Sequence, residues 1–302
     1  MRTSEYPYYC PPFPDFNIAQ AAVVPFLDED VNLVVSFATA VGKTVLAECC
    51  FAYHLSEEPH CRVVYVCPYR SLGAEKFKAW NEDPQLSNHG VVLGTGDTIT
   101  GAEDHMAGRL TITTSESFDA KTRSVSYADW LQSLRCVVFD EAHLMGDKQR
   151  GSAVEASMIR LTAVNPGARL VLLSATMGNA MELAKWVKSL NGKKTKCVVS
   201  SWRPSKIETI FVPFEDGTKV DEAVRLATES SDRKTVVFVH SKVTGAEIVK
   251  KLRNAKVRSV FHNASVPPAK RRKIEETFND RMSGLNVLVS TSTLGAGVNI
   301  GV

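Results

Sequence analysis

The sequence has no apolar run that approaches the length of a membrane span, and it does not begin with the charged-then-apolar pattern of a secretory signal. It also has no Cys-x-x-Cys pair, because its seven cysteines are scattered and most of them lie in apolar runs. We therefore expect neither zinc centres nor disulfides. The pattern is typical of reduced core cysteines in an intracellular protein with no membrane partner.

What the chain does have is ordinary for a soluble globular protein: 302 residues, 44% hydrophobic and 23% charged, enough for two domains. The net charge of +3 is unevenly distributed, because residues 217–302 hold 15 Lys and Arg against 8 Asp and Glu. Such an excess suits a polyanionic partner such as nucleic acid. A solvated basic face is the alternative interpretation.

Strand-like and helix-like segments alternate along the first two thirds of the chain. Six segments each hold a short apolar strand followed by polar or small residues: 31–37, 61–68, 90–97, 109–116, 134–143 and 168–176. Helical spacing is found in 17–27, 45–55, 70–81, 116–132, 151–164 and 179–190. The alternation predicts an α/β fold with a parallel, doubly wound sheet. Ligands gather at the carboxyl ends of such strands, so the polar clusters should share one edge.

The stretch Val31–Glu48 combines a buried strand, a loop of small residues ending in Gly42-Lys43-Thr44, and a helix. This context is typical of a phosphate-binding loop, in which backbone N–H groups and a lysine hold a polyphosphate and the threonine holds Mg²⁺. The first glycine of the general pattern is replaced by Phe37, and an idle loop is the alternative interpretation.

A second cluster follows the strand that begins at Leu134 and ends in Asp140-Glu141. Two adjacent carboxylates at the mouth of a sheet repel each other unless a cation lies near them. Asp140 is the candidate for the Mg²⁺ shell, and Glu141 for orienting and deprotonating the water that attacks a γ-phosphate. Solvated acids at the end of a strand are the alternative.

The order ATAVGKT, DEAH and SAT resembles motifs I, II and III of the superfamily 2 DExH (DEAH-box) helicases. The segments PYRSLGAEKF, GTGD and TTSESFD resemble further elements of that superfamily, and SWRPSKIE resembles a segment of its Ski-type group of archaeal repair and exosome-associated RNA helicases. In the second half, VVFVHSK, FHNASVPPAKRRKIEETF and NVLVSTSTLGAGVNIGV resemble motifs IV, IVa and V. The resemblance covers about residues 16–302, and its implied fold is a pair of RecA-like P-loop domains.

The resemblance implies ATP and Mg²⁺ as cofactors. Its nucleotide-site residues are Gln20, which would read adenine, the loop residues Thr39, Ala40, Val41, Gly42, Lys43 and Thr44, and the motif V residues Gly297 and Asn299. Thr44 and Asp140 would hold the metal, and Asp140, Glu141 and Lys43 would be catalytic. His143, Ser174 and Thr176 would couple the nucleotide site to closure of the two domains.

The resemblance also implies a single-stranded or overhang-bearing nucleic acid as partner, RNA or DNA. Its contact residues are Pro68, Arg70, Gly96, Thr114, Ser115, Ser241, Thr291 and Thr293. Individually, Arg70 could be a surface charge at a helix start, and the Ser-Ala-Thr segment could be a turn with hydroxyl caps.

The expected domains are an N-terminal arm (1–15), a first RecA-like domain (16–205), a linker (206–216) and a second RecA-like domain (217–302). The second domain is expected to hold strands at 234–239, 257–261 and 286–290 and helices at 219–229, 242–254 and 268–279. The family's arginine-bearing segment after motif V is not in the sequence, so we expect a truncated second domain. Because such arginines contribute roughly 10³–10⁵ in rate, this chain should bind ATP but hydrolyse it weakly.

The sequence thus predicts an ATP-driven helicase or translocase that moves along one strand, 3′ to 5′ by resemblance. Two alternatives stay open: an ATPase that remodels nucleic acid without separating strands, and a nucleotide-switched binding module that needs no turnover.

Overall fold

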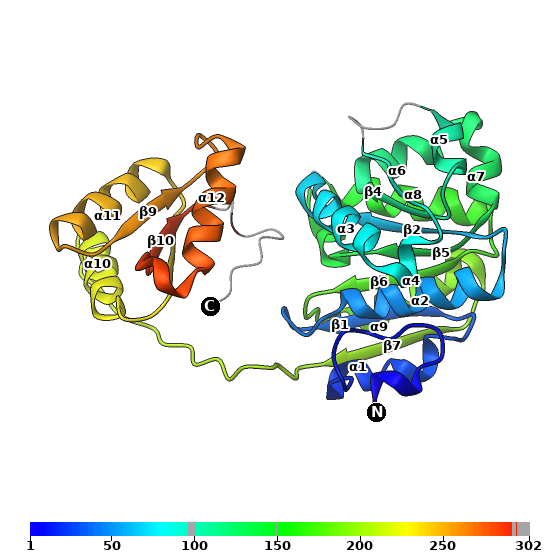
Figure 1. Cartoon of the computed structure of the whole chain (residues 1–302), viewed down its shortest axis with the longest axis horizontal. Coiled ribbons are helices and arrows are strands. Elements are labelled where there is room, and N and C mark those ends of the chain that lie inside the picture. Colours follow the sequence, from blue (N-terminus) through cyan, green and yellow to red (C-terminus); the bar gives the residue numbers. More distant parts are fainter. Residues whose placement is uncertain (96–100, 149, 292–293, 295–302) are drawn as a thin grey trace. The chain divides into compact units, whose positions relative to one another are not determined.

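Contacts along the chain divide it into two units, Met1–Lys206 and Ile207–Val302. The computed structural model describes residues 1–95, 101–148, 150–291 and 294 (Figure 1). Each unit is built on its own sheet of parallel strands flanked by helices. The predicted parallel α/β architecture is therefore confirmed. None of the described helices has the length and apolar composition that crossing a membrane requires.

The first unit contains a seven-stranded sheet in the order β3-β4-β2-β5-β6-β1-β7, and every pairing in it is parallel. Its strands are β1 (Asn32–Phe37), β2 (Arg62–Cys67), β3 (Val91–Leu93), β4 (Leu110–Thr114), β5 (Leu134–Phe139), β6 (Arg169–Ser174) and β7 (Thr195–Ser200). Because all strands run in one direction, their carboxyl ends lie on one edge of the sheet.

Helices cover both faces of this sheet. They are α1 (Ile18–Ala21), α2 (Thr44–Glu57), α3 (Arg70–Glu82), α4 (Pro84–Ser87), α5 (Ala102–Met106), α6 (Ser115–Thr122), α7 (Ala128–Gln132), α8 (Gly151–Val164) and α9 (Ala180–Asn191). On β1, Leu33 and Val35 join the hydrophobic cluster that includes α2 and α3, while Val34 joins the cluster on the opposite face with α8 and α9. Strands buried on both faces explain the nearly continuous apolar runs in the sequence.

The short helices α4 and α5 were not predicted, and the first unit differs from the predicted elements in three further places. The helix expected over 17–27 ends at Ala21, and a 3₁₀ turn follows, because Pro25 lacks an N–H and cannot continue a helix. The helix expected over 116–132 is interrupted by a 3₁₀ turn at Val125–Tyr127. Strand β7 was not predicted, since it is a half-exposed edge strand that pairs with β1 and has no long apolar run.

The N-terminal segment packs onto the first unit instead of extending away as a free arm. Tyr6 and Tyr9 are each 4% exposed, and the Tyr9 hydroxyl donates a 2.7 Å hydrogen bond to Asp83. Arg2 and Asp15 form an antiparallel bridge that closes the segment on itself. Residues 1–15 are therefore part of the core packing of this unit.

The second unit contains a three-stranded parallel sheet in the order β8-β10-β9. Its elements are α10 (Lys219–Glu229), β8 (Thr235–Phe238), α11 (Lys242–Asn254), β9 (Ser259–His262), α12 (Pro268–Asn279) and β10 (Val287–Ser290). Each predicted strand and helix of residues 217–290 is found within a few residues of its predicted bounds. Two small hydrophobic clusters cover the sheet, one against α10 and α11 and one against α12.

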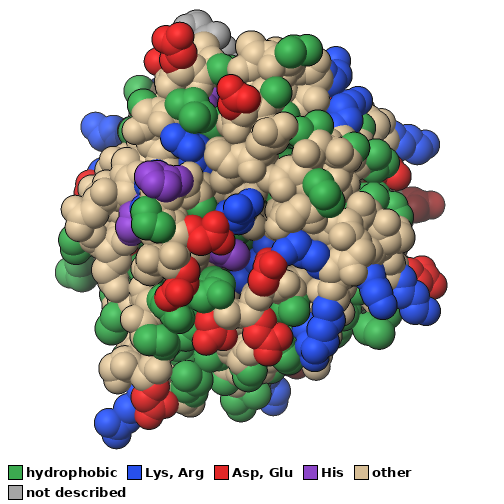
Figure 2. Space-filling model, turned by 90° about the vertical axis from the view of Figure 1, so that its right-hand side faces the viewer, with side chains coloured by type: hydrophobic (Ala, Val, Ile, Leu, Met, Phe, Trp, Pro, Cys, Tyr) green, Lys and Arg blue, Asp and Glu red, His purple; other side chains and the backbone are tan. Residues whose placement is uncertain are grey.

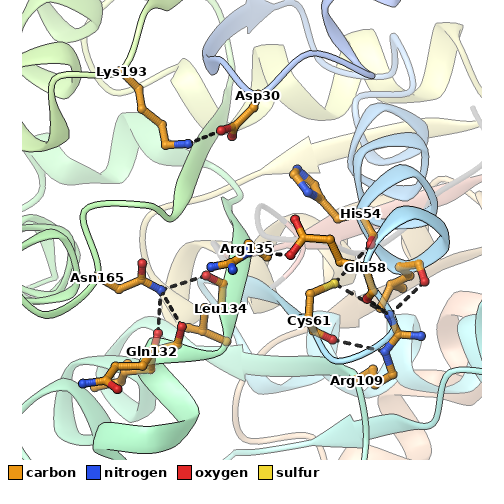
Figure 3. A network of polar contacts seen from close by, with 12 residues as sticks. Asp30, His54, Glu58, Cys61, Arg109, Gln132, Leu134, Arg135, Asn165 and Lys193 are labelled. Carbon is orange, nitrogen blue, oxygen red and sulfur yellow. Dashed lines mark hydrogen bonds and ion pairs between the residues drawn. The ribbon is translucent and has the colours of Figure 1, made fainter.

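At the amino ends of the strands in the first unit, buried and half-buried polar side chains bond to backbone carbonyls (Figure 3). Arg109, just before β4, donates to the carbonyls of Leu55 (2.8 Å), Glu58 (2.6 Å) and Cys61 (3.1 Å). The side-chain amide of Asn165, in the turn before β6, lies 2.8–3.2 Å from the carbonyls of Leu131, Gln132 and Leu134. These contacts satisfy carbonyls that would otherwise be buried without donors.

Arg169, the first residue of β6, is 0% exposed and makes the most deeply buried set of such contacts. Its guanidinium donates to the carbonyls of Val31 (2.7 Å), Leu27 (2.8 Å) and Phe26 (2.6 Å). The turn that precedes β1 is thereby joined to β6.

Arg169→Met should strongly destabilise the first unit, because three carbonyls lose their donor and each buried, unsatisfied group costs about 1–3 kcal/mol. We expect the free energy of unfolding to fall by at least about 3 kcal/mol in urea titrations. All four tryptophans (80, 130, 186 and 202) lie in the first unit, so tryptophan fluorescence reports on it alone. The control is Arg123→Met, whose side chain is 59% exposed and pairs with Asp119 at the surface; a loss as large as that of Arg169→Met would contradict the assignment.

His54 on α2 should make stability depend on pH. Burial lowers its pKa to about 3, whereas an unfolded histidine has a pKa of about 6.5. Between these values the unfolded chain binds one more proton, so the free energy of unfolding falls as the pH falls through this window. In His54→Leu, the slope of unfolding free energy against pH should be shallower by up to about 1.4 kcal/mol per pH unit. The exposed His60→Leu is the control, and an equal change in both variants would exclude His54 as the source.

Candidate active site

The loop Phe37–Thr44 joins the carboxyl end of β1 to the amino end of α2, a helix of 14 residues. Ala40 and Gly42 have positive φ angles of 63° and 82°, which turn the loop sharply. A Cβ on Gly42 would lie 2.7 Å from Nε2 of Gln20, so only glycine fits there. The helix dipole and the free N–H groups at this end favour an anion.

Lys43 is 9% exposed, and its Nζ donates to the carbonyl of Ala38 at 3.4 Å. The lysine thus folds back over its own loop, and it would have to exchange this acceptor for phosphate oxygens when a nucleotide binds. Thr44, the first residue of α2, is half-buried beside it, and Thr39 is exposed.

Gln20, predicted to read adenine, lies against the loop instead of pointing away from it. It is 3% exposed, and its Nε2 donates to the carbonyls of Val41 (3.1 Å) and Gly42 (3.0 Å). Its Oε1 accepts from the backbone N–H of Asn17 (3.0 Å), whose side chain donates to Val41 as well (2.9 Å). Gln20 therefore supports the loop, and reading of adenine stays a prediction. Asn17 was not among the predicted site residues, although the Asn-x-x-Gln spacing, which is typical of a helix capping box, could have indicated it.

The carboxylate pair lies directly after β5. Asp140 Oδ1 accepts from the backbone N–H of Glu141 at 2.9 Å, and its Oδ2 accepts from the hydroxyl of Tyr65 on β2. Tyr65 is 0% exposed, and the rings of Phe51 and Trp80 pack edge-on against it. Sequence analysis missed Tyr65, which looked like an ordinary member of an apolar strand, yet it fixes the orientation of Asp140.

Glu141 is a strained residue in a charged environment. Its backbone is left-handed, with φ 50°. Burial raises the pKa of its carboxyl group, the charge of Asp140 raises it further, and Lys43 and His143 lower it. The influence of Lys43 agrees with the topology of the sheet, which brings the loop after β1 and the acids after β5 to the same edge.

The site fits a divalent cation bound through a nucleotide. Glu141 Oε2 is buried and accepts no hydrogen bond from the described residues, although His143 Nδ1 lies 3.3 Å from it. No cluster of three or more His, Cys, Asp or Glu side chains in the described residues forms a metal cage. Mg²⁺ commonly takes one or two carboxylates, water and phosphate oxygens, and Asp140 with the Thr44 hydroxyl matches that set.

Two of the three residues predicted to form a relay, His143 and Ser174, lie close together, and the relay itself stays a prediction. Nδ1 of His143 lies 3.4 Å from the Ser174 hydroxyl and accepts from the backbone N–H of Ala175 at 3.4 Å. Thr176 is exposed, and its hydroxyl makes no hydrogen bond to the described part of the chain. A hollow of about 440 Å³ beside His143 is lined by Ala142, His143, Met145, Gly146, Met177, Gly178, Asn179 and Leu183.

Four of the predicted nucleic-acid contacts, Pro68, Arg70, Thr114 and Ser115, lie in the described part of the first unit and at the same edge. Pro68 follows β2, and its carbonyl accepts from Arg150 at 3.0 Å. Arg70 begins α3 and is exposed. Thr114 ends β4 and caps α6 by accepting from Ser117 N–H at 3.3 Å, and Ser115 begins that helix. Arg150, which also stacks on Tyr69 at 4.5 Å, is a cation at this edge that sequence reasoning missed.

The carbonyl of Gly94, the residue after β3, accepts three hydrogen bonds from side chains. Gly94 O accepts from the Thr113 hydroxyl (2.9 Å), the Ser117 hydroxyl (2.8 Å) and Nζ of Lys121 (3.0 Å). Burial lowers the pKa of Lys121 to about 8. The predicted contact Gly96 lies two residues further on and outside the described residues.

In the second unit, Ser241 caps α11 by accepting from Thr244 N–H at 3.0 Å, and Thr291 N–H donates to His262 O at 3.3 Å. Thr293, Gly297 and Asn299 lie outside the described residues. On the side of the molecule drawn in Figure 2, acidic and basic side chains are interspersed with apolar ones.

Two family models match the chain: DEAD/DEAH box helicase over residues 17–183 and helicase conserved C-terminal domain over residues 218–302. The chain is 30% identical to the ATP-dependent DNA helicase Hel308 of Pyrococcus abyssi over 316 residues, covering 90% of this chain and 42% of that protein. For Hel308 of Pyrococcus horikoshii the identity is 30% over 310 residues, covering 89% and 41%. The chain thus spans less than half the length of these relatives.

Solved structures share the fold. The DUF1998 helicase MrfA bound to DNA superposes with a TM-score of 0.76 at 20% identity, covering 96% of this chain and 44% of that one. The helicase Lhr of Mycobacterium smegmatis, bound to ssDNA and AMP-PNP, has a TM-score of 0.65 at 24% identity, covering 94% and 40%. These likenesses bear out the RecA-like architecture. With a family model that spans more than half of its residues, the chain belongs to the DEAD/DEAH box helicase family.

Proposed function

We propose that this chain is the motor part of an ATP-dependent nucleic-acid helicase or translocase that moves along a single strand, 3′ to 5′. The observation that carries the proposal is that the parallel sheet brings the Phe37–Thr44 loop after β1 and the Asp140-Glu141 pair after β5 to one edge, where the charge of Lys43 acts on Glu141. Within the family we place the chain in the Ski-type group, on the strength of the Trp202-Arg203-Pro204 segment. The relatives named above are DNA helicases, so DNA is the first candidate strand and RNA the second.

In the proposed mechanism, Lys43 and the loop N–H groups bind the β- and γ-phosphates at the amino end of α2. Thr44 and Asp140 would hold Mg²⁺, which supplies positive charge at the phosphate oxygens when bound. Glu141 would orient the attacking water and accept its proton. A raised pKa suits this role, because a general base works best with a pKa near the working pH. The motif V residues Gly297 and Asn299 are proposed to face the nucleotide from the second unit.

The nucleic-acid strand is proposed to run along the carboxyl edge of the first sheet and to be bound through its phosphates. The proposed contacts are Pro68, Arg70, Gly96, Thr114, Ser115, Ser241, Thr291 and Thr293. Backbone contacts of this kind are sensitive to salt and tolerant of sequence. Thr114 and Ser241 support the proposal by their place, because each is the N-cap of a helix, α6 and α11, and the amino end of a helix favours an anion.

Lys43→Ala and Glu141→Gln should separate nucleotide binding from hydrolysis. Lys43→Ala should weaken binding of a fluorescent ATP analogue with Mg²⁺ at least tenfold, about 1.4 kcal/mol, because the phosphates lose their buried cation. Glu141→Gln should keep that affinity and lower single-turnover hydrolysis by roughly 10²–10⁴, because it cannot accept a proton. The 302-residue chain is expected to turn ATP over weakly, so binding is the primary measurement.

The control is Lys188→Ala, an exposed lysine in the last turn of α9, which should change neither quantity. Equal nucleotide affinity in wild type and Lys43→Ala would overturn the assignment of the loop. In the whole protein, full function in Glu141→Gln would favour the nucleotide-switched binding module.

Arg70→Ala should weaken binding of a single-stranded oligonucleotide similarly for every sequence tested. Loss of one phosphate contact should make the slope of log K against log salt shallower by about 0.7. Fluorescence anisotropy at several salt concentrations, with DNA and RNA oligonucleotides, measures both effects. Arg123→Ala, at the far end of α6, is the control; an unchanged slope in Arg70→Ala would remove this residue from the proposed path. Strand displacement by the whole protein on 3′ and 5′ overhangs tests polarity, and ATP hydrolysis without displacement would favour the remodelling ATPase.

A further inference from the structure

The segment Ala175–Met177, which carries the exposed Thr176 of the proposed relay, follows β6 without forming a helix or strand. Its backbone groups are therefore not fixed by a sheet ladder or a helix. Side chains from other segments hold them instead, and the strongest of these contacts come from a residue with no role assigned so far.

That residue is Ser36 on β1, which is 0% exposed and lies opposite Ser174 in the β1–β6 pairing. Its hydroxyl donates to the carbonyl of Ala175 at 3.2 Å and accepts from the backbone N–H of Met177 at 2.9 Å. One oxygen thus holds the peptide groups on both sides of Thr176. Because each bond fixes a different neighbour, the position of Thr176 is determined by the position of Ser36.

The remaining constraints on the segment are few. The Ala175 N–H donates to His143 Nδ1 at 3.4 Å, which joins the segment to the carboxylate motif. Met177 and Gly178 line the hollow of about 440 Å³, and Met177 also packs against the hydrophobic cluster that includes α8 and α9. The hydrogen bonds of the segment come from β1 on one side and His143 on the other.

Ser36 also stands directly before the phosphate loop. Phe37 follows it, and the next residue, Ala38, supplies the carbonyl that Lys43 contacts. When Lys43 leaves that carbonyl for a phosphate, the start of the loop loses one contact. A shift at the start of the loop moves the end of β1. The two hydrogen bonds of the Ser36 hydroxyl then transmit this movement to Thr176.

We propose that Ser36 is a positioning residue that couples the nucleotide site to the relay segment, and that nucleic-acid affinity responds to nucleotide through it. The inference rests on the proposed function, because it assigns a route between the two proposed ligands. Coupling between two sites is reciprocal and typically amounts to about 5–150-fold in affinity. Ser36 touches neither ligand, so its removal should reduce the coupling while leaving each ligand's own binding nearly unchanged.

The test measures the affinity of a fluorescent single-stranded oligo(dT) with and without AMP-PNP and Mg²⁺, in wild type and Ser36→Ala. The ratio of the two affinities is the coupling factor. We expect the coupling factor of Ser36→Ala to be at least threefold weaker than that of wild type, that is, nearer to one. The affinity for AMP-PNP itself should change less than twofold. Ser36→Thr, which keeps the hydroxyl and suits a strand, should restore the coupling factor.

The matched control is Ser157→Ala on α8, also 0% exposed, whose hydroxyl donates to Val154 O at 2.8 Å within its own helix. Ser36→Ala loses two hydrogen bonds and Ser157→Ala loses one, so both variants should lose stability, but only Ser36→Ala should change the coupling factor. If Ser36→Ala does not fold, Ser36→Cys replaces it, since a thiol keeps the volume and is a weak donor and acceptor.

The outcomes are distinguishable. A wild type that binds neither AMP-PNP nor oligo(dT) contradicts the proposed function, and the inference falls with it. A wild type that binds both without coupling, or a Ser36→Ala or Ser36→Cys variant with the full wild-type factor, overturns the inference and leaves the proposed binding sites standing. A reduced factor in both Ser36→Ala and Ser157→Ala overturns it too, since the effect would then follow from lost stability.

Discussion

The uniform direction of the seven strands in the first sheet is the constraint on which the rest of this unit depends. Parallel pairing brings the residues after β1, β2, β4, β5 and β6 to one edge, although they are as far apart in sequence as Lys43 and Ser174. Segments that are far apart in the sequence thereby become neighbours. The backbone hydrogen bonds between paired strands are the only contacts between strands that this requires. The proximity of Lys43 to Glu141 is a consequence of topology first and of side-chain chemistry second.

Polar groups make different kinds of hydrogen bonds at the two edges of this sheet. At the amino edge, the half-buried Arg109 and the buried Asn165 and Arg169 donate to several backbone carbonyls, although Nε of Arg62 has no hydrogen-bond partner in the described part of the chain. At the carboxyl edge, Glu141 Oε2 has no hydrogen-bond donor among the described residues and Lys43 has only a long contact to a carbonyl. One edge stabilises the fold, and the other keeps binding capacity for a ligand.

Much of this could be predicted from sequence, because buried parallel strands and the motifs after them leave strong local patterns. Strand β5 and its two acids were found from an apolar run and a charge pair. Strand β7 was missed because an edge strand with one partner needs no apolar run. Tyr65 and Ser36 were missed for another reason: each lies in a buried strand, where tyrosine and serine look like packing residues until their hydroxyls are seen to contact Asp140 and Ala175. Gln20 was found, but its contacts to Val41 and Gly42 depend on a turn that no local pattern encodes.

The backbone strain at the site is related to the difference between the two edges of the sheet. Ala40 and Glu141 both have left-handed backbones, a conformation that costs a residue with a side chain on the order of 1–3 kcal/mol. Such conformations persist only where the surroundings hold them, and here Gln20 and Asn17 support the loop while Tyr65 and Asp140 support the acid. A rigid sheet can carry this cost because its stability resides at the opposite edge and in the two hydrophobic layers. The fold therefore does not depend on a relaxed backbone at these two residues, and their conformations can serve ligand binding instead.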